Sequence, residues 1–226
     1  MALSNTSTLN RASAYLTDSW QGACDRWNMV PVSLRDGFVL WLGWTGLTWT
    51  AFALSLTFIE IGERGDLSLL DSLMGGGLVG FAQWLMIRPH LKRAYGWIGL
   101  SVLCWGALTL LSNGLTGGAV GWIAPTTLNL FVRVLLGLLN GFCVGLVLGA
   151  GQWWMLRQRV EKAWRWIWLS AGIWSVAIAF GWLLGGVLRL VSNLFVAEVI
   201  GLGVAWAIVA ALSGMAVVGM VYQKRD

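Results

Sequence analysis

Long apolar runs alternate with short polar or charged segments along most of the chain. A run of about 20 apolar residues is long enough for a helix to cross the hydrocarbon layer of a membrane. The pattern therefore predicts six membrane-spanning helices. They are expected at Phe38–Ile59, Leu67–Ile87, Ala94–Leu111, Val134–Leu156, Trp164–Leu188 and Val199–Tyr222.

The composition agrees with this class of protein. Of the residues, 58% are hydrophobic and 11% are charged, which is far more apolar than a soluble domain of this size. No segment between the runs is long enough for a second core, so we predict an all-α, polytopic transmembrane helical bundle occupying 37–222. A cytoplasmic segment, 1–36, precedes it and a cytoplasmic tail, 223–226, follows it. The N-terminal segment lacks the apolar stretch of a signal peptide, so no cleavage is expected.

The basic residues predict the orientation of the six spans. Cytoplasmic segments of membrane proteins are enriched in Lys and Arg. With the N-terminus inside, twelve basic residues fall on the cytoplasmic side, and only Arg64, Arg133 and Arg189 fall outside. Both termini are therefore predicted to be cytoplasmic. The formal charge of +5 is explained by topology, and no nucleic-acid partner is expected.

Two segments do not follow the alternation of membrane spans and polar loops. The uncharged, glycine-rich stretch Ser112–Pro125 is either a surface loop or a segment that dips back into the membrane. Before the first span, Leu16, Trp20, Cys24 and Trp27 share one helical face, which predicts a short amphipathic helix on the cytoplasmic interface.

The strongest signal is an internal repeat. Shifting the sequence by 69 residues aligns Gly76–Trp105 with Gly145–Trp174 without a gap, and twelve of the thirty positions are identical. Each copy is predicted to be a helix hairpin, at 67–111 and at 134–188. Both hairpins run in the same direction through the membrane, so the repeat is parallel, unlike the inverted repeats of many transporters.

Small residues recur every fourth position on one face of the first helix of each hairpin. This stripe includes Gly76 and Gly80 in the first copy and Gly141, Gly145 and Gly149 in the second. Small residues allow two helices in lipid to approach closely. The stripes predict close helix packing, either within the chain or against another protein.

Each stripe ends in polar and aromatic residues that also recur. Trp84 with Arg88, and Trp153 with Arg157, are predicted to anchor the helix ends at the headgroups. Gln83 and Gln152 lie within the apolar layer, where a buried amide needs a partner. They form either an interhelical hydrogen bond or a polar pocket. The two elements are the segments GFAQWLMIR, Gly80–Arg88, and GAGQWWMLR, Gly149–Arg157.

This doubled G-x-x-Q-W-x-x-[LI]-R element, followed by a Trp-rich helix, resembles a loose group of uncharacterised bacterial membrane proteins that are frequent in cyanobacteria. The resemblance covers about half of the chain. It implies a setting in a bacterial plasma membrane or thylakoid and no particular chemistry. Pro89 and His90 in the first copy break the symmetry of the two loops.

No catalytic or metal-binding motif is present in the sequence, so we predict no enzyme, metal or cofactor. The ionisable residues of the spans lie near the outer helix ends, where Arg189 with Glu198 and Arg133 with Asp71 are expected to pair. The single histidine, His90, lacks a second ligand, although it leaves pigment or haem binding open as an alternative.

Seventeen tryptophans are present, and most are assigned to interfacial belts. The deeper ones could contact an apolar ligand. They are Trp49, Trp105, Trp174 and Trp206.

Two functional hypotheses follow. The first is a non-enzymatic scaffold, accessory subunit or assembly factor of a membrane complex, with the lipid bilayer and other membrane proteins, or a second copy of the chain, as partners. The glycine stripes and the cytoplasmic Trp and Arg residues would be its contact surfaces. The alternative is a channel or transporter for a small neutral or lipid-like molecule, in which Gln83 and Gln152 line a polar notch between the hairpins.

Overall fold

The computed structural model describes residues 34–59, 68–91, 94–116, 125–158 and 160–221, and these contain helices and no strand. The helices are α2 (Leu34–Ser55), α3 (Leu69–Ile87), α4 (Gly96–Thr116), α5 (Leu130–Leu156), α6 (Arg165–Ser192) and α7 (Val196–Val221). All six are long and apolar enough to cross a membrane. The predicted number and approximate places of the spans are confirmed, and the chain is an all-helical integral membrane protein.

The helix boundaries differ from the apolar runs mainly at the ends away from the basic loops. Helix α4 continues to Thr116, so the first residues of the uncertain segment 112–125 are helical. Helix α5 begins at Leu130, because the Asn129 side chain accepts a hydrogen bond from the Val132 amide and caps it. Residues 117–124 and the predicted amphipathic helix before residue 34 lie outside the described part of the chain.

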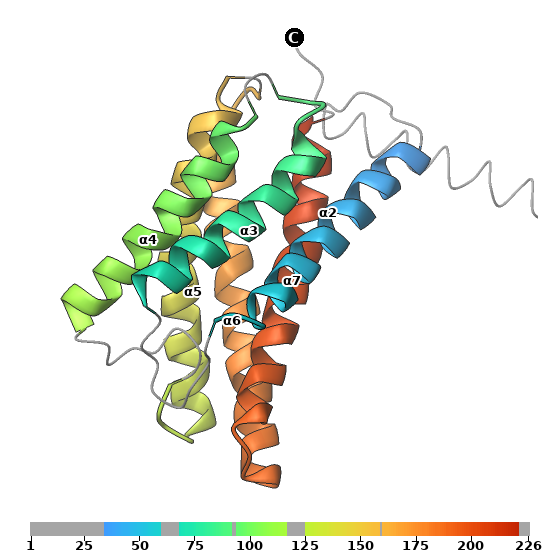
Figure 1. Ribbon diagram of the computed structural model, residues 1–226. Helices are drawn as coiled ribbons and strands as arrows, with labels where there is room; N and C mark the ends of the chain where they lie inside the picture. The colour runs from blue at the N-terminus through green and yellow to red at the C-terminus, as the bar shows by residue number, and fades with distance from the viewer. Residues whose placement is uncertain (1–33, 60–67, 92–93, 117–124, 159, 222–226) are drawn as a thin grey trace, which may run out of the picture.

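Each helix packs against its neighbours in the sequence, and α7 packs back against α2. The six helices therefore form a closed ring in chain order. In Figure 1 the last turns of α3, α5 and α7 lie together at the top of the view, and the turn from α6 to α7 lies at the bottom. We call the first of these the basic end, because the described part of the α3–α4 and α5–α6 connections includes Arg88, Arg157 and Lys162.

Tryptophan side chains of α2 close the ring against α7. The indole N–H of Trp41 donates to the Ala211 carbonyl at 2.9 Å, and that of Trp49 donates to the Gly203 carbonyl at 3.0 Å. Between them, Trp44 donates to the Ser213 hydroxyl at 3.0 Å. Several tryptophans of this helix thus satisfy polar groups of a neighbouring helix in addition to covering apolar surface.

The glycine stripe of α5 lies directly on the backbone of α6. A Cβ added at Gly141 would be 2.6 Å from the Trp174 carbonyl carbon, and one added at Gly145 would be 2.6 Å from the Ala171 Cα. In the other hairpin, a Cβ at Gly76 or Gly80 would meet side-chain atoms of α4 instead. The α5–α6 hairpin is therefore the more tightly joined of the two.

A buried ion pair joins the other end of the bundle. Arg133 on α5 pairs with Glu198 on α7, and both side chains are almost fully buried. The Arg133 guanidinium also donates to the Trp182 carbonyl at 2.8 Å and to the Thr127 carbonyl at 3.0 Å. Since the donors of the buried cation reach several acceptors, this side chain links two helices and the segment before α5.

The pairing differs in part from the expectation. The predicted Arg189–Glu198 contact is present, at 3.8 Å. The predicted Arg133–Asp71 pair is wrong, because Glu198 takes the charge of Arg133. Asp71 instead completes a capping box with Ser68 at the start of α3, which satisfies free amides of the first turn.

Candidate functional site

Two cavities lie along the axis of the ring, and side chains from all six helices line each of them. The first, which we call the basic-end cavity, has a volume of about 30 Å³. Its polar lining comprises Gln83, Ser101, Gln152, Ser170 and Ser213. Among the described residues, no charged side chain lines it. An uncharged polar chamber inside an apolar bundle is a candidate binding site for a small molecule.

The second cavity, the far cavity, has a volume of about 90 Å³ and is mainly apolar. The two cavities share Val79, Trp105, Trp174 and Trp206 in their linings. Among these, the three indole rings touch one another, with centroids 5.1 to 5.8 Å apart. We call them the Trp wall.

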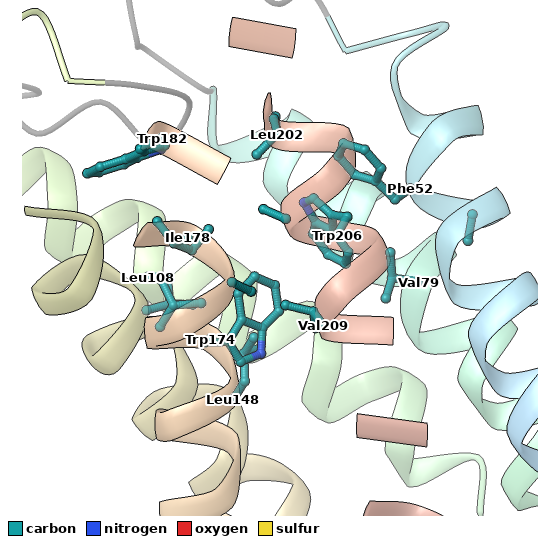
Figure 2. Packing of buried hydrophobic residues seen from close by; sticks show 14 of the residues in the cluster. Phe52, Val79, Leu108, Leu148, Trp174, Ile178, Trp182, Leu202, Trp206 and Val209 are labelled. Carbon is teal, nitrogen blue, oxygen red and sulfur yellow. The ribbon is translucent and has the colours of Figure 1, made fainter. Parts of the chain in front are cut away.

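Figure 2 shows Trp174 of α6 and Trp206 of α7 side by side in the core between the helices. Phe52 of α2 stacks on Trp206, with ring centroids 4.7 Å apart, and holds it from the other side. Three of the four deep tryptophans singled out in the sequence thus meet on the axis. The fourth, Trp49, is 44% exposed and lines neither cavity.

Both predicted glutamines line the basic-end cavity, and each is held by a tryptophan of its own hairpin. The indole N–H of Trp97 donates to Gln83 Oε1 at 3.0 Å, and that of Trp166 donates to Gln152 Oε1 at 2.9 Å. Each bond joins residues 14 positions apart, and the second bond lies 69 residues after the first, at the equivalent positions of the other hairpin. The buried amide therefore makes an interhelical bond and also faces a cavity, so the two interpretations offered by the sequence coexist.

Replacing Gln83 with leucine keeps most of the side-chain volume but leaves the buried Trp97 indole N–H without an acceptor. We expect the free energy of unfolding in mixed micelles to fall by about 1–3 kcal/mol. The matched control is Gln158→Leu, because Gln158 is exposed just after α5. Equal stability of the two variants would show that the Trp97–Gln83 bond contributes little.

Serines 101 and 170 are functional candidates that the sequence argument missed. Both line the basic-end cavity and are nearly fully buried. A Cβ at Gly80 would lie 2.6 Å from the Ser101 Cβ, and one at Gly149 would lie 2.9 Å from the Ser170 Cβ. Their identity in the aligned hairpins was the available signal, but serine on an apolar helix is common enough to be overlooked.

The predicted anchors make equivalent contacts in the two hairpins. The Arg88 guanidinium lies 5.3 Å from the Trp84 ring centroid, and Arg157 lies 5.3 Å from that of Trp153. Arg157 also lies 3.5 Å from the ring of the exposed Trp154. Such exposed cation–π contacts contribute about 0.5–1 kcal/mol each, so they fix side chains at the basic end rather than form a pocket.

His90 lies in the connection between α3 and α4 and lines neither cavity. Partial burial lowers the pKa of its imidazole, which keeps the ring neutral near pH 7. Pigment or haem binding stays a prediction, and the visible absorbance of the purified protein tests it.

Comparison of the chain with protein-family models, with curated proteins and with solved structures found no match.

Proposed function

We propose that this protein moves a small uncharged molecule across the membrane along the axis of the helix ring. The observation that carries the proposal is the basic-end cavity, which all six helices line and to which five of them contribute a polar, uncharged side chain. Buried polar groups in a membrane bundle are costly unless they serve packing or a pathway. Here four buried polar residues line one space: Gln83, Ser101, Ser170 and Ser213.

The two hairpins support a pathway between them. We propose that they are copies of one unit, because Gln–Trp, Gly–Ser and Trp–Arg contacts occur at matched positions in both. The basic end is proposed to be cytoplasmic, as its loops carry the excess of Lys and Arg. The basic-end cavity would then open toward the cytoplasm and the far cavity toward the outside.

The Trp wall is proposed to be the barrier of this pathway. Its three rings line both cavities and contact one another in one stacked and two edge-to-face pairs, so aromatic groups lie where the two cavities meet. Passage therefore requires at least one of these rings to move. An apolar constriction of this kind slows water and rejects ions because it removes their hydration.

The test is solute flux into proteoliposomes, followed by stopped-flow light scattering after an osmotic jump with water, urea, acetamide or glycerol. We expect at least one solute to cross faster than in protein-free liposomes. Trp206→Leu should increase that rate, because it shortens one ring of the barrier. Trp49→Leu is the matched control, since Trp49 also packs against α7 but lines neither cavity.

Unchanged permeability for every solute, in the wild type and in Trp206→Leu alike, would contradict the proposal. An equal rise in both tryptophan variants would point to a general loosening of the bundle instead of a pathway at the Trp wall.

A second proposal keeps the scaffold function, on the strength of exposed aromatic groups at the basic end. Trp154, Trp164 and Trp168 are each more than half exposed there, with Arg157 against the first of them. Aromatic and Arg residues are enriched at protein contacts.

Affinity purification from native membranes should recover the chain with its partner proteins in fixed proportion. The Trp154→Ala variant should no longer recover these partners. Recovery of the chain alone would contradict this role.

A further inference from the structure

We propose that the basic-end cavity binds its molecule through an oxygen atom that accepts hydrogen bonds from Gln83, Gln152, Ser101 and Ser170. This inference rests on the proposed passage and names the class of molecule that it takes. The site combines one amide and one hydroxyl from each hairpin.

The indole groups determine which end of each amide is available. An indole N–H can only donate, so the amide oxygen must face it, and the amide NH2 group points elsewhere. Trp97 holds Gln83 in this way, and Trp166 holds Gln152. Neither amide nitrogen makes a hydrogen bond to another described residue. Two pairs of N–H donors therefore remain for whatever occupies the cavity.

The hydroxyl groups add to this set of donors. Ser101 is only 3% exposed, lines the cavity, and its Oγ has no hydrogen-bond partner among the described residues. Ser170 is 4% exposed and lines the same space. A buried polar group without a partner is unfavourable, and the two amide NH2 groups can only donate, so an occupant that supplies acceptor lone pairs satisfies them.

The volume of the cavity and the charge of its lining further restrict the class of molecule that it can bind. About 30 Å³ exceeds the roughly 10–15 Å³ that one water molecule requires, so the cavity holds a very small molecule. Since the described lining includes no charged residue, an ion would lose its hydration without compensation. The oxygen of water and the carbonyl oxygen of a small carboxamide both meet these conditions.

The decisive variant is Ser101→Ala. It removes one donor without breaking any hydrogen bond to the described protein, so the fold should be retained. The matched control is Thr48→Val, because the Thr48 hydroxyl is also buried without a partner but lines neither cavity. Binding of acetamide to the full chain in lipid nanodiscs is measured by saturation-transfer NMR, with thermal unfolding as a check of the fold.

We expect acetamide to bind the wild type and Thr48→Val equally, and Ser101→Ala about fivefold more weakly, as befits the loss of one hydrogen bond. If acetamide does not bind, but Ser101→Ala alone changes the osmotic water permeability of proteoliposomes, the acceptor is water. If Ser101→Ala matches Thr48→Val in both measurements, the site is wrong. Acetamide binding without flux of any solute would retain the site and overturn the passage.

Discussion

Gly141→Ala is expected to lower the free energy of unfolding by about 2–3 kcal/mol, which is a large effect for a single methyl group. The added Cβ would lie 2.6 Å from the Trp174 carbonyl carbon and 2.7 Å from the Ser175 Cα. These are backbone atoms of α6, so no side-chain rotation relieves the contact. The two helices must separate, and the dispersion contacts along their whole seam weaken.

The measurement is equilibrium unfolding in mixed micelles titrated with a denaturing detergent. Gly172→Ala is the control, because a Cβ at Gly172 on the partner helix would meet no atom within 4 Å. It should be neutral or slightly stabilising, since alanine favours helix over glycine by about 1 kcal/mol. If Gly141→Ala were as stable as Gly172→Ala, the close contact of α5 with α6 would be refuted.

Removing one member of the buried ion pair should have an even larger effect. We expect Arg133→Met to destabilise the protein by about 3–5 kcal/mol, because Glu198 would stay buried without its main counter-charge. The tight fit adds to this cost. Gly185 and Gly186 leave the space for the pair, since a Cβ at Gly186 would lie 2.6 Å from the Arg133 Nε.

A double-mutant cycle measures the interaction energy between Arg133 and Glu198 apart from their contacts with other residues. The variant carrying both Arg133→Met and Glu198→Met should lose much less stability than the sum of the single variants, because no unpaired charge remains. Arg189→Met is the control and should cost under about 1 kcal/mol, as Arg189 is partly exposed and lies 3.8 Å from Glu198. Additive losses in the cycle would contradict a coupled pair.

The close contact between α5 and α6 bears on the choice between the passage and the scaffold functions. The stripe residues Gly141 and Gly145 face α6 of the same chain, so a partner protein cannot use that face without first displacing α6. The scaffold proposal is thereby left with the basic-end aromatic residues as its contact surface. The passage proposal gains from the same packing, because a rigid pair of helices positions Gln152 and Ser170 on the axis.

The sequence alone determined the six membrane-spanning helices that the described residues contain, because an apolar stretch of sufficient length has one stable arrangement in lipid, a hydrogen-bonded helix. It also identified Gln83, Gln152 and three of the central tryptophans, since polar and aromatic residues stand out against an apolar background. The caps at Ser68 and Asn129 were not predicted, although each forms with a residue only three positions further along the chain.

Only the tertiary structure decided which groups meet. Arg133 pairs with Glu198, which lies 65 positions away in the chain, because α6 packs against both α5 and α7 and its Gly185 and Gly186 leave space for the two side chains. The ring closes where α7 packs against α2. Only this closure brings both glutamines, the two serines and the Trp wall around one axis. Such contacts depend on how helix faces turn toward one another, and this is decided by packing across the bundle rather than by periodicity within a helix.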